Sequence, residues 1–284
     1  MRTLLVTPSY GPDLKRCQLL VQSANRYVSG IDRHLIIIDE AERYLFQPLE
    51  SERVQLVSKE SMLPWWIRRN PLSSRWWLSL SSLPVRGWIM QQVIKLAVAE
   101  HYQADLLLFA DSDMVFIKPF TPEHIITDGK VRHYRSERKP VMYSDRRYRN
   151  WYAQAAGVCG IADANTIGGA YISQLNSWRH ENIVELYRLI EAQGSQGWMT
   201  QLLRCLDMSE FVLYGTYVDH VLGPLSGHYV DEQEICHSSW YYQINSQQDV
   251  CSFVDQLSPQ HRALHLQSNL GLAPDLLSAF SLSA

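Results

Sequence analysis

Short apolar runs alternate with longer amphipathic stretches over the first half of the chain. The runs that lack a helical period, and therefore predict buried strands, are Thr3–Thr7, His34–Asp39, Val54–Val57 and Leu106–Ala110. Helices are expected over residues 13–27 and 85–100, and the second carries Val85, Ile89 and Val93 at helical spacing. Alternating strands and helices are typical of a mostly parallel sheet, whose ligands bind at the carboxyl ends of the strands.

The second half of the chain is less regular. Helices are expected over residues 183–193 and 198–206, and glycines such as Gly215, Gly223 and Gly227 interrupt the pattern elsewhere. The sequence contains no internal repeat, low-complexity tract or linker that would mark a boundary. We therefore expect one α/β domain made of a regular first half and a less regular second half.

Two carboxylates follow the apolar run that ends at Ala110. Strand alternation predicts Asp111 and Asp113 on one side of the chain and Ser112 on the other. Two carboxylates this close repel each other unless a cation or a proton neutralises them. Mg²⁺ and Mn²⁺ accept such carboxylates and complete their shells with water and phosphate oxygens. The alternative interpretation is an Asp pair that only caps a turn.

Polar residues also follow the first two predicted strands. Tyr10 comes after the first and Asp39 ends the second, so both are expected near Asp111 at one edge of the sheet. This convergence predicts a ligand site there. For Asp39 the alternative is a cap on the following helix.

Charge and cysteine content argue against several classes of function. A formal net charge of -3 argues against a nucleic-acid partner, which normally meets a basic surface. The five cysteines are scattered and form no CxxC pair, which indicates reduced thiols and neither a disulfide frame nor a zinc site. The apolar residues after Met1 are too few for a signal peptide, and no run is long enough to span a membrane. We therefore expect a cytoplasmic protein.

The segment 64–77 combines tryptophan and arginine pairs. Trp65-Trp66 precedes Arg68-Arg69, and Arg75 precedes Trp76-Trp77. This combination suits sugar stacking, peripheral contact with a membrane, or contact with another protein. The alternative is a loop whose tryptophans fill the core while the arginines extend to solvent.

Several stretches together resemble a known family. They are Val6–Asp13, Val85–Leu96, Phe109–Phe116, Ser209–Asp219 and Cys236–Trp240. They are similar to bacterial GT-A-type glycosyltransferases, and closest to the uncharacterised group called DUF6492. The resemblance spans most of the chain and implies a Rossmann-type, mostly parallel sheet flanked by helices. It implies that residues 1–120 bind the nucleotide sugar and that residues 121–284 bind the acceptor and complete the metal site, within one domain.

The resemblance also implies a reaction. A hexosyltransferase-like enzyme would move a sugar from a nucleoside-diphosphate sugar, most simply a UDP-sugar, to an acceptor hydroxyl in polysaccharide or glycan synthesis. The acceptor could be a glycan, a lipid-linked molecule or a small molecule. Mn²⁺ or Mg²⁺ would bridge the diphosphate. The sequence leaves the donor sugar, the acceptor and the stereochemistry of transfer open.

Binding roles follow from the same resemblance. The expected metal ligands are Asp111, Asp113 and His237, with His265 as the rival for the third position. The expected donor-binding residues are Thr7, Ser9, Tyr10, Asp39, Arg86, Lys95, Asp111 and Ser112. Gln91 and Gln92 are weaker candidates. His237 could equally be an ordinary core or surface histidine.

Two carboxylates are candidates for catalysis on the acceptor side. Glu210 lies in an apolar, aromatic stretch where desolvation would raise its pKa, as suits a general base. Asp219 is the second candidate. Glu210 could instead lie at a helix N-terminus beside Ser209 for structural reasons.

Two other classes of function compete with a transferase. Asp111-Ser112-Asp113 also fits haloacid-dehalogenase-like phosphohydrolases, in which the first Asp is the nucleophile. Those enzymes carry the motif on their first strand and add a later Asp pair, whereas two predicted strands come first here. The other alternative is an inactive GT-A-like module that binds carbohydrate or a partner.

Overall fold

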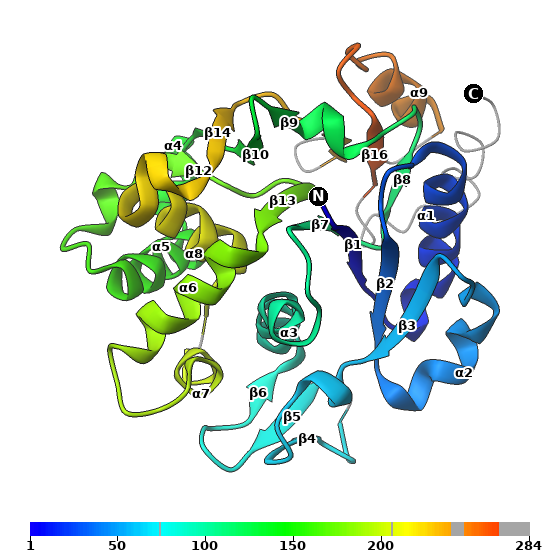
Figure 1. Ribbon diagram of the computed structural model, residues 1–284. Helices are drawn as coiled ribbons and strands as arrows, with labels where there is room; N and C mark the ends of the chain where they lie inside the picture. The colour runs from blue at the N-terminus through cyan, green and yellow to red at the C-terminus, as the bar shows by residue number, and fades with distance from the viewer. Residues whose placement is uncertain (74, 206, 240–246, 267–284) are drawn as a thin grey trace.

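A mostly parallel sheet lies at the centre of the protein (Figure 1). The structure is a computed structural model and describes residues 1–73, 75–205, 207–239 and 247–266. In spatial order, the sheet consists of β13 (Leu175–Arg179), β7 (Leu106–Ala110), β1 (Thr3–Pro8), β2 (Arg33–Ile38) and β3 (Val54–Ser58). Strand β13 runs antiparallel to β7, and the other neighbours are parallel. The strands expected in the first half are thus confirmed.

Helices cover both faces of the sheet. They are α1 (Leu14–Tyr27), α2 (Arg43–Phe46), α3 (Gly87–His101), α4 (Pro140–Ser144), α5 (Arg146–Cys159), α6 (His180–Glu191), α7 (Trp198–Leu203), α8 (Glu210–Tyr217) and α9 (Gln247–Val254). Figure 1 shows α1 and α2 on one side of the sheet and α3, α6 and α7 on the other. The predicted mixed α/β class is confirmed.

Strand alternation explains how the two faces are filled. Leu4, Val6 and Phe109 belong to the larger core that includes the apolar side of α3. Leu5 and Leu108 point the other way and pack with residues of α1. Because every second side chain of a strand faces the same layer, a strand buried on both faces needs a continuous apolar run. This requirement accounts for the apolar runs in the sequence.

Smaller sheets surround the central one. They comprise β4 (Ile67–Arg69), β5 (Trp76–Ser79) and β6 (Val85–Arg86); β9 (Ile126–Thr127), β10 (Lys130–Tyr134) and β14 (His228–Asp231); β11 (Ser136–Glu137) and β12 (Gly169–Ala170); and β8 (Met114–Phe116), β15 (Cys236–Ser238) and β16 (Ala263–His265). The last sheet brings the end of the described chain next to the segment after β7.

Several predicted boundaries need correction. The helix expected to begin at Val85 begins at Gly87, because Val85 and Arg86 pair with β5. The helix expected over residues 183–193 is α6, which begins earlier, at His180. Residue 206, the expected end of another helix, lies outside the described residues. Among the described helices, none is both long and apolar enough to cross a membrane.

Two helical glycines give a test of this packing. A methyl group on Gly215 of α8 would overlap the Tyr171 ring, whereas one on Gly157 of α5 would meet no atom within 4 Å. Alanine favours a helix over glycine by about 1 kcal/mol, and overpacking costs roughly 1–3 kcal/mol. We therefore expect Gly157→Ala to raise the free energy of unfolding by up to about 1 kcal/mol and Gly215→Ala to lower it. Urea unfolding measures both, and equal effects would contradict the close packing of α8 on Tyr171.

Candidate active site

The carboxyl ends of β1, β2 and β7 meet at a cavity of about 740 Å³. Its lining includes Ser9, Tyr10, Asp39, Asp111 and Asp113, which come from three separate strand ends. The predicted convergence of Tyr10, Asp39 and Asp111 at one edge of the sheet is therefore confirmed. We call this space the donor-side cavity.

The Asp-x-Asp residues form a turn between β7 and β8. Strand β7 ends at Ala110, one residue before Asp111, and β8 begins at Met114. Asp111, Ser112 and Asp113 all line the donor-side cavity. Strand alternation, from which we predicted opposite sides for Ser112 and the two carboxylates, does not apply, because the chain has left the strand before the motif begins.

Lys95 of α3 holds the first carboxylate of this turn. Its Nζ lies 3.1 Å from Asp111 Oδ1 and 2.9 Å from Glu210 Oε1, and its side chain is almost fully buried. Burial alone would lower the pKa of Lys95, but the two carboxylates outweigh burial and raise it above its usual value. Lys95 is therefore a permanent cation that offsets the charges of Asp111 and Glu210.

The second carboxylate faces a histidine from the end of the described chain. His265 Nε2 lies 3.3 Å from Asp113 Oδ2, because β16 pairs antiparallel with β8 and sets His265 opposite Met114. The predicted ligand His237 points elsewhere: its Nε2 donates to the carbonyl of Phe253 at 2.9 Å and its ring stacks on that side chain. The structure thus favours the rival histidine.

The fit of this cluster to a metal can be judged from its donors. Carboxylate oxygens and an imidazole nitrogen suit Mg²⁺ or Mn²⁺. In the conformation described, no group of three or more His, Cys, Asp or Glu side chains is close enough to form a complete metal site, counting only the described residues. Asp113 and His265 face each other, and Asp111, from the same turn as Asp113, is held by Lys95.

Asp13 is a site residue that the sequence reasoning missed. Its carboxylate accepts a hydrogen bond from Ser112 Oγ at 3.5 Å and pairs with Arg16 at 3.2 Å. Burial raises the pKa of Asp13, and the nearby charge of Asp113 adds to that rise. Its position after the first strand, just beyond Tyr10, was the signal that could have identified it.

Asp39 is surrounded by cations. Its Oδ1 lies 3.2 Å from Lys59 Nζ and 2.9 Å from Arg69 Nη1. The alternative in which Asp39 caps the following turn is not supported, since its side chain makes no capping hydrogen bond. Lys59 follows β3 directly, so the strand-end reasoning that found Asp39 would also have found this lysine.

The tryptophan-rich segment borders the donor side. Trp76 and Trp77 line the donor-side cavity together with Arg69 and Arg75, and the Arg86 guanidinium lies over the Trp76 ring. The segment therefore adjoins the strand-end cluster, and none of its described residues lines the cavity beside Glu210.

Thr7 does not line either cavity described here. It is fully buried within β1, and its hydroxyl bonds His34 Nε2 at 2.9 Å. Burial lowers the pKa of His34 to about 3, so this histidine is neutral. Thr7 therefore links β1 to β2 through its side chain, and its role in donor binding stays a prediction.

A second cavity, of about 860 Å³, adjoins the first. Both cavities are lined by Arg86, Trp88, Gln91 and Asp111, so they meet at the first carboxylate of the turn. The second cavity also contains aromatic side chains suited to stacking on sugar rings, namely Tyr134, Tyr148, Trp151 and Tyr171. We call it the acceptor-side cavity.

Glu210 lines the acceptor-side cavity. It is the first residue of α8, whose N-cap Ser209 accepts a hydrogen bond from the Val212 amide. Both carboxylate oxygens of Glu210 are buried, and one pairs with Lys95. Burial raises the pKa of Glu210 even though Lys95 opposes the shift. A base must contact the acceptor hydroxyl, and these covered oxygens do not support that predicted role.

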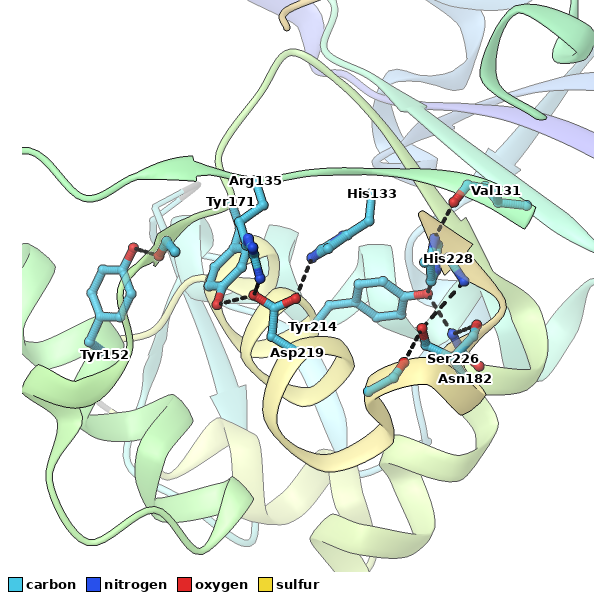
Figure 2. Close-up of polar contacts among 12 residues, drawn as sticks. Val131, His133, Arg135, Tyr152, Tyr171, Asn182, Tyr214, Asp219, Ser226 and His228 are labelled. Carbon is cyan, nitrogen blue, oxygen red and sulfur yellow. Dashed lines mark hydrogen bonds and ion pairs between the residues drawn. The ribbon is translucent and has the colours of Figure 1, made fainter. Parts of the chain in front are cut away.

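Asp219, the other predicted base, is engaged in a separate network. Figure 2 shows its carboxylate facing Tyr171, Arg135 and His133. The Tyr171 hydroxyl donates to Oδ2 at 2.9 Å, and Arg135 Nη1 lies 3.2 Å from the same oxygen. Tyr171 lines the acceptor-side cavity and Asp219 does not. The catalytic role of Asp219 stays a prediction; in the structure its carboxylate orients the tyrosine.

Comparison with known proteins identifies the fold. No curated protein matches the sequence. Among solved structures, the apo form of mouse xyloside xylosyltransferase 1 is similar, with a TM-score of 0.51, 11% identity, and alignment over 96% of this chain and 100% of that one. The similarity shows a GT-A glycosyltransferase fold, as expected. A family model described as a family of unknown function, DUF6492, matches residues 4–269, so the chain belongs to the DUF6492 family.

Proposed function

We propose that this protein is a metal-dependent glycosyltransferase that moves a sugar from a UDP-sugar to an acceptor hydroxyl. The observation that carries the proposal is the Asp111–Asp113 turn at the junction of two cavities. A transferase needs a nucleotide site and an acceptor site that meet where the sugar bond breaks and re-forms. The fold supports the same assignment.

The donor-side cavity fits a nucleoside diphosphate. Tyr10, half exposed, offers a ring that can stack on a base, and Asp39 offers a carboxylate acceptor. Arg86 and Arg75 supply positive charge for phosphate oxygens at the same cavity. Tyr10 and Arg86 are therefore proposed to bind opposite ends of the nucleotide.

Asp111, Asp113 and His265 would hold the Mn²⁺ or Mg²⁺ ion. Such an ion offsets the negative charge that develops on the departing nucleoside diphosphate. Asp13 and Ser112 orient the turn from the other side, because the Ser112 hydroxyl donates to Asp13. His237 is not part of this proposal.

Lys95 and Glu210 position the turn. Because Lys95 contacts both carboxylates, Glu210 fixes the ammonium group that fixes Asp111. Both carboxylate oxygens of Glu210 are buried, and one of them pairs with Lys95. We therefore assign Glu210 as a positioning residue.

The phosphohydrolase alternative loses support. Its nucleophile would be Asp111, but Oδ1 of that residue is paired with a buried lysine. The strand that leads to Asp111 is also not the first of the fold, and the similar solved structure is a transferase. An inactive binding module would retain the cavities, and the measurements below distinguish it by transfer activity.

The first prediction concerns the nucleotide. Calorimetry with UDP should show binding that requires Mn²⁺ and disappears with EDTA, because the diphosphate would bind through the ion. Asp113→Ala should weaken Mn²⁺-dependent binding at least about tenfold, since a direct ligand is removed. GDP tests the contribution of the base, and CMP, which carries a single phosphate, tests the contribution of the diphosphate. Binding that is indifferent to both EDTA and Asp113→Ala would refute the metal role.

The second prediction compares the two histidines. His265→Ala should weaken Mn²⁺-dependent UDP binding by roughly tenfold or more, because the His265 ring faces Asp113. His237→Ala should leave that binding within about threefold, because its Nε2 is used by the Phe253 carbonyl. Thermal unfolding of both variants controls for damage to the fold. The opposite ranking would restore His237 as the ligand.

The third prediction separates two roles for Glu210. Glu210→Gln keeps the shape but removes the charge that holds Lys95, so UDP affinity in Mn²⁺ and the rate of sugar transfer should both fall, each by about tenfold. A general base would behave differently, with a loss of about 10²-fold or more in turnover and unchanged UDP affinity. Calorimetry paired with a donor-turnover assay gives both readings. Unchanged affinity with abolished transfer would return Glu210 to the base role.

A further inference from the structure

The small sheet of β4, β5 and β6 exposes an unusual combination of side chains. Figure 1 shows it projecting from the body of the protein beside α3. We define the ribbon surface as the exposed residues Trp65, Arg68, Leu72, Leu80 and Leu83. Leu72 is 94% exposed, Leu80 79% and Trp65 72%. Large apolar side chains are therefore exposed to solvent near the turns of the ribbon.

The exposure follows from the register of the strands. Arg68 lies opposite Leu78, and Trp76 lies opposite Arg86, which puts each pair on the same face. Only one face of the ribbon can pack against the protein. Ile67 and Trp77 lie on that face and pack into the main core on the α3 side. The outward face is left with arginines next to apolar side chains.

The charge of this region has one sign. From Ser61 to Ile94 the sequence contains no Asp or Glu, and its charged residues are Arg68, Arg69, Arg75 and Arg86. The chain as a whole is slightly negative. Among the described residues, no carboxylate lies within ion-pairing distance of Arg68 or Arg75. The charge of this surface is therefore complementary to that of an anionic partner.

We propose that the ribbon surface docks on a membrane that contains anionic lipid. Tryptophan and leucine side chains enter the boundary between headgroups and acyl chains, and arginines pair with lipid phosphates. A protein partner would need acidic groups around an apolar surface, whereas a lipid bilayer supplies both properties over any area. The proposal is independent of the transferase activity.

The apolar character continues from the ribbon surface toward the site. A groove of about 780 Å³ between the ribbon and α7 is lined by Leu83, Pro84, Ile89 and Leu203. Trp76 and Arg86 line both this groove and the donor-side cavity. A docked membrane would thus lie next to the mouth of the donor-side cavity.

Vesicle sedimentation of the full chain tests the proposal. The protein should sediment with vesicles of phosphatidylcholine mixed with about one-third phosphatidylglycerol, much less with phosphatidylcholine alone, and less as salt is added. Arg68→Glu should weaken binding at least about fivefold, because one favourable charge near the lipid is lost and reversed. Leu72→Ser combined with Leu80→Ser should weaken it about tenfold.

Matched substitutions elsewhere provide the controls. Leu225, 88% exposed and outside the ribbon, and the exposed Arg188 of α6 offer Leu225→Ser and Arg188→Glu, which should leave vesicle binding unchanged. No binding to the anionic vesicles, or equal losses in the controls, would overturn the proposal. So would a dimer in light scattering that Leu72→Ser with Leu80→Ser disperses, since the surface would then bind a second copy.

Discussion

The site depends on the ion pairs that the buried ammonium group of Lys95 makes with Asp111 and Glu210. A charge away from water is tolerated only when opposite charges contact it, and Asp111 and Glu210 do so within about hydrogen-bonding distance. The three residues come from α3, the turn after β7, and the start of α8. Their ion pairs tie the sheet to the helical half at the junction of the two cavities. Removal of Lys95 would leave two neighbouring carboxylates without their shared cation.

The remaining site residues are arranged around this ion triad. On one side Asp13 and Ser112 hold the turn, and on the other His265 faces Asp113. Cations around Asp39 close the far end of the donor-side cavity. Tyr171, oriented by Asp219, belongs to the acceptor-side cavity. The two cavities share Arg86, Trp88, Gln91 and Asp111, and each adds residues from its own part of the chain.

The first half of the fold could be predicted because its strands are buried on both faces and leave continuous apolar runs. Strand ends then located Tyr10, Asp39 and Asp111. Contacts between distant segments could not be predicted in this way. The pairing of β16 with β8 decides that His265, and not His237, reaches Asp113, and nothing in the local pattern near either histidine encodes that register. The burial of the Glu210 oxygens likewise depends on Lys95 from another helix.

The position of β16 also has a consequence for the order of events during synthesis. Four of the five central strands and the Asp111–Asp113 turn come before residue 114, but His265 comes much later in the sequence and reaches Asp113 through β16. Contacts between segments so distant in sequence form late, because closing the long intervening loop loses more chain entropy than forming local contacts. A ribosome-bound chain can therefore complete its central sheet well before it completes the histidine–carboxylate pair. The proposed metal site would therefore gain its histidine only after β16 has left the ribosome.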